Sequence, residues 1–146
     1  MDDEIVENFV SKVNQAAKLE DPDIKEEALE KVFEEVCGLS DKKQKVEVFN
    51  NLLVIKEHWH HKEILQGLQG LADPSSLIFI EEAFNQGFEH IDDYNGSGYA
   101  PIAKWFSHTL ASIGTKEAVE LIERFSNSEN IEISTEMKYR LNNISA

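Results

Sequence analysis

The sequence predicts an all-α fold of stacked antiparallel helical hairpins with seven or eight helices. Apolar residues recur every three or four positions along most of the 146 residues, which is the spacing of one buried helix face. Short groups of turn and capping residues separate these apolar segments. One pair of segments also matches the next pair at a fixed spacing, as in repeat proteins. We therefore expect a single helical domain over residues 1–146.

The predicted helices fall into two groups. Residues 1–56 are expected to form N-terminal helices that cap the stack, and residues 57–146 are expected to form its hairpins. The first two predicted helices span 3–18 and 23–37, the third is capped by Ser40 and ends near residue 55, and the fourth runs from near His58 to Leu71. The fifth spans 75–88, and the sixth runs from Pro101 to Ile113. The seventh follows Gly114-Thr115 and ends at Phe125, and the last spans 131–144. Residues 89–99 form the one long loop of this prediction.

Three small residues carry packing expectations. Cys37, the single cysteine, stands beside Val36 in an apolar pattern, so we expect a buried and unreactive thiol. Gly67 and Gly70 lie inside a predicted helix, where each costs about 1 kcal/mol in helix propensity. We expect both glycines to allow the close approach of a neighbouring helix.

The repeat joins two predicted hairpins. The segment that begins at Asp73 matches the segment that begins at Gly114, a spacing of 41 residues, and Phe84 then falls on Phe125. A period of about 40–47 residues with two helices per unit is typical of HEAT and armadillo repeats, which stack because one hairpin cannot bury its apolar face alone. The prediction is therefore a HEAT- or armadillo-like α-solenoid. The alternative is a helical bundle without repeats.

The charge is strongly acidic. Asp and Glu outnumber Lys and Arg by 28 to 14, for a formal net charge of −14. By segment, the charge is −8 over residues 1–37, +1 over 38–72 and −7 over 73–146. Nucleic acids and anionic membranes are bound through Lys and Arg, so this balance argues against both as partners. An acidic surface instead attracts a basic partner, although the charge could also serve solubility alone.

The sequence also bears on location. No apolar run approaches the ~20 residues that span a bilayer. The acidic start, Met1-Asp2-Asp3-Glu4, differs from the basic start of a signal peptide. We therefore expect a cytoplasmic protein.

Several motifs between residues 57 and 142 resemble one known family. They are Glu57-His58-Trp59-His60-His61, Leu71-Ala72-Asp73-Pro74-Ser75, Ile113-Gly114-Thr115-Lys116-Glu117-Ala118 and Tyr139-Arg140-Leu141. In this order they resemble the HEAT-repeat-like immunity proteins of bacterial polymorphic toxin systems, which include those of contact-dependent growth inhibition. The resemblance implies a HEAT-like fold. It also implies that the chain binds a cognate toxin domain and carries out no chemistry itself.

The histidines near Trp59 are the first alternative to a binding role. His58, His60 and His61 are of the commonest metal-ligating type, but the HExxH pattern of zinc proteases is absent. We expect Trp59 to anchor the hairpin and the three histidines to line a helix start.

Two further chemical readings fail on spacing. Asp92, Asp93 and Asn95 precede Gly96 as in a calcium loop, but the loop positions that need acids fall on Ile91 and Ile102. Ser107 and His108 are adjacent on a predicted helix, so their side chains should point apart. We therefore expect no metal, no cofactor and no enzymatic activity.

Acidic residues on the second helices of the hairpins are the predicted binding site. In a stack of hairpins the second helices line one continuous surface. The predicted partner-binding residues are Glu81, Glu82, Glu120 and Glu123 on those helices, with Glu89, Asp92, Asp93 and Tyr94 in the loop. We expect them to bind a cognate, basic, nuclease-type toxin domain. The alternatives are an ordinary solvated face and a HEAT-like scaffold or adaptor that binds another protein.

Overall fold

Helices make up most of the computed structural model, which describes residues 2–55, 58, 60–86 and 100–144. The α-helices are α1 (Asp2–Ala17), α2 (Pro22–Cys37), α3 (Lys42–Leu53), α4 (His61–Leu71), α5 (Leu77–Gln86), α7 (Ala100–Ile113), α8 (Lys116–Phe125) and α9 (Ile131–Ile144), with a 3-10 turn, η1 (Pro74–Ser76), before α5. Over these residues no strand occurs, so the all-α prediction is confirmed there. None of the helices described has both the length and the apolar character needed to cross a membrane.

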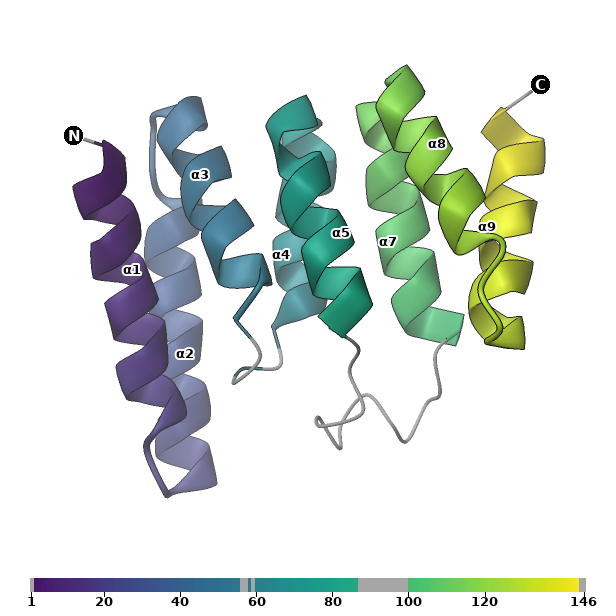
Figure 1. Ribbon diagram of the computed structural model, residues 1–146. Coiled ribbons are helices and arrows are strands. Elements are labelled where there is room, and N and C mark those ends of the chain that lie inside the picture. The colour runs from purple at the N-terminus through teal and green to yellow at the C-terminus, as the bar shows by residue number, and fades with distance from the viewer. Residues whose placement is uncertain (1, 56–57, 59, 87–99, 145–146) are drawn as a thin grey trace.

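The helices lie in two layers (Figure 1). Helices α1, α3, α5 and α8 form the layer nearer the viewer, and α2, α4, α7 and α9 form the layer behind it. Within the near layer α1 packs on α3 and α3 contacts α5, while α4, α7 and α9 pack in that order behind them. The chain passes from one layer to the other at each turn, so successive helices run in opposite directions.

Aspartate and threonine side chains begin several of the helices. The Asp21 carboxylate accepts hydrogen bonds from the backbone N–H groups of Asp23 and Ile24, and Pro22 opens α2, one residue before the predicted start. Helix α3 is capped by Asp41, which accepts from the N–H of Gln44 at 3.1 Å. The prediction that Ser40 caps this helix is therefore wrong by one residue, because Asp41 stands directly before the first helical turn.

The packing of α3 on α4 depends on one of the two glycines. A Cβ placed on Gly67 would lie 2.8 Å from the ring of Phe49, so the aromatic ring fills the space that a side chain would need. The expected close approach is confirmed at this position. It is wrong for Gly70, where no atom of another part of the structure lies within 4 Å of such a Cβ.

One apolar core extends through the whole stack, from Phe9 in α1 to Met137 in α9. Every helix contributes at least one of its buried members, as shown by Phe9, Leu29, Leu52, Leu68, Ile80, Phe106, Ile122 and Met137. The ring of Phe84 lies 4.2 Å from the ring of Phe125 and 4.9 Å from that of Phe106, measured between centroids. These contacts join α5, α7 and α8.

Cys37 is exposed, and the prediction of a buried thiol is wrong. Its neighbour Val36 is fully buried. Because successive residues of a helix point about 100° apart, the last residue of α2 turns away from the core toward the exposed side of Glu30 and Glu34.

Candidate protein-binding surfaces

The acidic residues predicted on α5 and α8 lie on two helices that contact each other. Glu82, Glu120 and Glu123 are exposed. Glu81 is half-buried and forms an ion pair with Arg124 of α8. The other four predicted residues, Glu89, Asp92, Asp93 and Tyr94, lie outside the described residues.

This acidic face also contains cations. Lys116 and Arg124 are exposed on α8, four residues before and four residues after Glu120. Residues at this spacing are neighbours on a helix surface. The carboxylates of Glu82, Glu120 and Glu123, which we call the front acidic face, are therefore interrupted by two positive charges.

A second acidic surface lies on α2, and the sequence analysis missed it. Asp23, Glu27, Glu30 and Glu34 are all exposed, and their spacings of four, three and four residues place them on one side of the helix. The buried residues Leu29 and Val36 lie on the opposite side. We call these four carboxylates the α2 ridge. The spacing is visible in the sequence, although the sequence prediction gives this region only a capping role.

The histidines before α4 hold the connection from α3. The Nε2 atom of His58 bonds to the carbonyl of Leu52 at 2.8 Å, and its Nδ1 accepts from the N–H of His60 at 3.0 Å. His58 therefore carries its proton on Nε2. His61 uses Nε2 on the carbonyl of Ile55 at 3.0 Å, and its ring stacks 4.3 Å from that of His58.

Burial dominates the titration of His58. It lowers the pKa of His58 to about 4, against a smaller opposite effect of the hydrogen bond to Leu52. A neutral imidazole with both nitrogens in use fixes the chain between two helices. Among the described residues, no group of three or more His, Cys, Asp or Glu side chains is placed to hold a metal ion.

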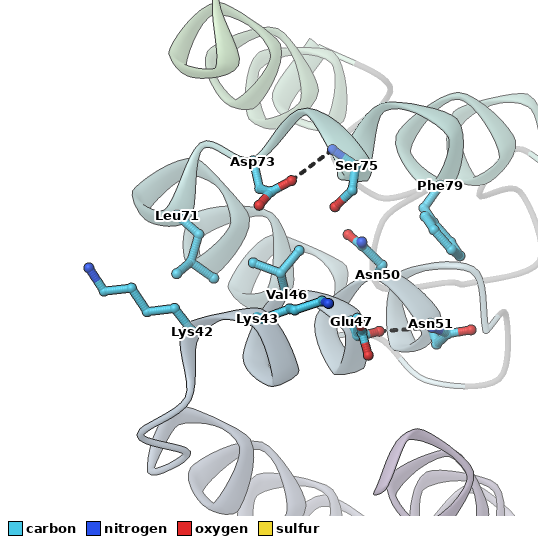
Figure 2. Close-up of a pocket in the computed structure, with 10 residues that line it drawn as sticks. All are labelled: Lys42, Lys43, Val46, Glu47, Asn50, Asn51, Leu71, Asp73, Ser75 and Phe79. Carbon is cyan, nitrogen blue, oxygen red and sulfur yellow. Dashed lines mark hydrogen bonds between the residues drawn. The ribbon is translucent and has the colours of Figure 1, made fainter. Parts of the chain in front are cut away.

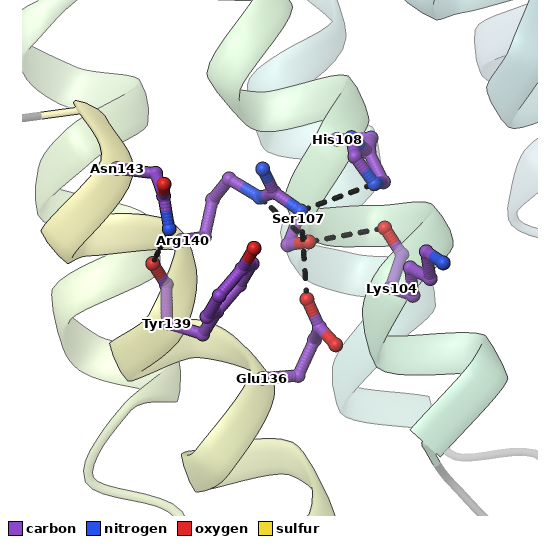
Figure 3. Close-up of polar contacts among 7 residues, drawn as sticks. All are labelled: Lys104, Ser107, His108, Glu136, Tyr139, Arg140 and Asn143. Atoms are coloured by element: carbon purple, nitrogen blue, oxygen red, sulfur yellow. Dashed lines mark hydrogen bonds and ion pairs between the residues drawn. The ribbon is translucent and has the colours of Figure 1, made fainter.

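Arg140 joins α9 to α7 (Figure 3). Its Nε lies 3.4 Å from the hydroxyl of Ser107, and its Nη2 lies 3.1 Å from Nε2 of His108 and 3.6 Å from a Glu136 carboxylate oxygen. Ser107 and His108 were expected to point apart, yet the long guanidinium reaches both. The Ser107 hydroxyl donates to the carbonyl of Lys104 at 3.0 Å.

The charge state of His108 follows from this arrangement. Burial lowers the pKa of His108 first, and the positive charges of Arg140 and Lys104 lower it further, while Glu136 acts against them. A neutral His108 accepts a hydrogen bond from Arg140, which is always charged. Ser107 and His108 thus both serve the contact of α7 with α9. This geometry does not activate Ser107 as a nucleophile.

A groove of about 540 Å³ opens between α3 and the α4–α5 connection (Figure 2). Lys43, Val46 and Asn50 line it from α3, and Leu71, Ser75 and Phe79 line it from the other side. Asn50 is only 2% exposed. In the described part of the chain its Oδ1 atom has no hydrogen-bond donor.

Comparisons with known proteins add no functional assignment to these surfaces. No protein-family model, no curated protein and no solved structure matches this chain.

Proposed function

We propose that this chain is an immunity protein that binds a cognate, basic toxin domain of the nuclease type and blocks its active site or the entry of its substrate. The observation that carries the proposal is the exposure of Glu82, Glu120 and Glu123 on two helices that contact each other. The formal net charge of −14 supports it, because it favours association with a positively charged partner.

The HEAT- or armadillo-like solenoid is part of the same proposal. It is supported by the two-layer packing of the helices and by the spacing of 41 residues between the segments at Asp73 and Gly114. Phe84 and Phe125, at matching positions of the two hairpins, pack against each other. Contacts between equivalent residues of neighbouring units are what a stack of repeats produces.

The proposed inhibition is electrostatic and steric. A nuclease holds its substrate through Lys and Arg side chains that neutralise phosphates. Carboxylates on the front acidic face occupy such a groove in place of phosphates, and the bulk of the helical stack then excludes nucleic acid. The inhibitor itself needs only to bind, so no catalytic group is required of it.

Two acidic surfaces compete for this role. The front acidic face lies in the near layer of the stack, and the α2 ridge lies in the other layer. We assign the partner to the front acidic face, because α5 and α8 belong to the proposed hairpins, whereas α2 belongs to the proposed cap.

The test is capture of the partner from the bacterium that encodes the chain. A tagged full-length chain is purified at about 150 mM salt, where exposed charges more than about 8 Å apart are largely screened. We expect one basic protein domain in stoichiometric amount, and purified chain should inhibit its nuclease activity. A partner without toxic activity, retained equally well by Glu120→Lys, would contradict the proposal.

The second candidate is a scaffold or adaptor that binds another protein. Ile78 of α5 and Ile131 of α9 are 71% and 74% exposed, so each is available to an apolar residue of such a partner. A captured partner that belongs to a larger assembly and lacks toxicity would support this role instead.

A further inference from the structure

The groove between α3 and α5 is built from one helix face and one tight connection. Lys43, Val46 and Asn50 stand at positions i, i+3 and i+7 of α3, so they share a face of that helix. The opposite wall is held by Asp73, whose carboxylate accepts from the N–H of Ser75 at 2.9 Å. Phe79 follows on α5, and Val46 and Leu71 are the other apolar residues of the lining; Figure 2 shows Leu71 and Phe79 at opposite ends of the groove.

Asn50 is the unusual residue of this groove. A buried carbonyl oxygen without a donor costs about 1–3 kcal/mol, so buried polar groups are nearly always paired. An apolar side chain of similar size would avoid this cost, which indicates that the amide serves something outside the described chain.

The chemistry of a primary amide points to the ligand. Asn50 offers one acceptor and two donors, which match the N–H and C=O of a single peptide group. The apolar lining residues around it, Val46, Leu71 and Phe79, suit one apolar side chain. Polar groups in small number within a mainly apolar concavity are the usual form of a binding site.

The charge of the groove differs from that of the rest of the molecule. Lys42 and Lys43 are balanced by Glu47 and Asp73, so the lining has no formal net charge in a chain of −14. A basic segment belongs on the front acidic face, whereas this groove suits an uncharged one. Both surfaces meet on α5, where Phe79 of the groove and Glu82 of the front acidic face are three residues apart.

We infer that this groove binds an uncharged, extended peptide segment of the protein partner. One peptide group of the segment pairs with the amide of Asn50, and the apolar side chain next to it packs against Val46, Leu71 and Phe79. The inference depends on the proposed function only in that the partner is a protein.

The test uses the full chain and a minimal probe, N-acetyl-phenylalanine N-methylamide, followed by NMR of isotope-labelled protein. This probe has two peptide groups, one apolar side chain and no charge. We expect saturable shifts of the Asn50 side-chain NH₂ signals and of backbone amides near residues 43–50 and 71–79. The dissociation constant should be about 1–10 mM, because so few contacts support only weak binding. The glycine analogue should bind at least about tenfold more weakly, since it lacks the apolar side chain.

Two variants make the test specific. Asn50→Leu fills the same space with an apolar group and should weaken binding of the probe about tenfold. Phe79→Ala should weaken it by a similar factor. Asn142→Leu, an exposed asparagine on α9, is the matched control and should bind as the native chain does. The inference is overturned if no saturable shift occurs in the groove at about 50 mM probe. Unchanged affinity in a folded Asn50→Leu chain overturns it as well.

Failure here and failure of the proposed function are distinguishable. If a captured toxin domain binds the Asn50→Leu chain as tightly as the native chain, the peptide groove is contradicted and the immunity role is not. If the probe binds at Asn50 but the captured partner is not a toxin, the immunity role is contradicted and the peptide groove is supported.

Discussion

Arg124 of α8 forms an ion pair with Glu81 of α5, so one of the predicted partner-binding carboxylates already has a cationic partner within the chain. The Arg124 side chain is 63% exposed and that of Glu81 is 33% exposed. Exposed pairs of this kind contribute about 0–1 kcal/mol to stability. The main effect of Arg124 is therefore on the charge presented to a partner rather than on folding.

Arg124→Ala should strengthen binding of a basic partner with little change in stability. The substitution frees Glu81 and removes a positive charge from the front acidic face, so association should be faster at low salt. Stopped-flow association at two salt concentrations measures this, and urea unfolding should shift by less than about 1 kcal/mol. Lys116→Ala removes a charge from the same helix without breaking the Glu81 pair, and it should have the smaller effect on association. The reverse order would contradict this account of the Arg124 pair.

Charge reversal separates the two acidic surfaces. Glu120→Lys should weaken binding of the captured partner about tenfold, because an attraction becomes a repulsion. It should also flatten the dependence of affinity on salt. Glu30→Lys, the same change on the α2 ridge, should leave affinity within about twofold. Calorimetric titration of both variants against the partner measures the difference. A larger loss for Glu30→Lys would place the partner on α2 instead.

The two glycines of α4 should respond to alanine in opposite directions. Gly67→Ala places a methyl group 2.8 Å from the ring of Phe49, and the forced shift should destabilise the fold by about 1–3 kcal/mol. Gly70→Ala has open space and should stabilise by about 0.5–1 kcal/mol through helix propensity. Urea denaturation of the pair measures both values. Equal effects would show that α3 and α4 do not pack as described.

His58 should make the protein less stable in mild acid. Its folded pKa, about 4, lies below the ordinary value of 6.5, so the unfolded chain binds the proton more readily. The contribution is fully present above pH 6.5 and is lost as the pH falls toward 4, for a total of roughly 3 kcal/mol. Urea unfolding between pH 7 and pH 4.5 measures the slope. His58→Gln keeps a donor for Leu52 and does not titrate, so it should be less sensitive to pH, and an unchanged slope would contradict the buried neutral state.

Cys37 should react in the folded protein. Its exposure at the end of α2 predicts native-state labelling by a thiol reagent at nearly the rate of the denatured chain. Mass spectrometry of the labelled protein in buffer and in urea measures both rates. Much slower labelling of Cys37 in buffer than in urea would contradict its exposure and support the buried thiol that the sequence predicts.

Helices were the most predictable part of this fold. The apolar spacing of Val32, Phe33 and Val36 predicts both the helix and a buried face for α2, and these three residues are buried. End positions were less predictable, because the Asp41 and Ser40 side chains are both suitable caps and only the geometry of the first turn selects one. Cys37 was misplaced because its apolar character was given more weight than its position on the helix.

The candidate sites were predictable only where one helix carries them. The α2 ridge is visible in the spacing of Asp23, Glu27, Glu30 and Glu34 within one helix. The groove depends on Asn50 and Phe79, which come from different helices and meet only through packing. The reach of Arg140 to Ser107 likewise joins residues 33 positions apart, and no local pattern indicates it.

The most direct test of the central claim is a contact competition in the organism that encodes the chain. A strain without the gene is grown in contact with its parent, and its survival is counted. The proposed immunity role predicts that the strain is killed, that the native chain supplied in trans rescues it, and that a folded Glu82→Lys, Glu120→Lys, Glu123→Lys chain does not. Survival of the deletion strain equal to that of its parent, in cells shown to deliver their toxins, would contradict the claim.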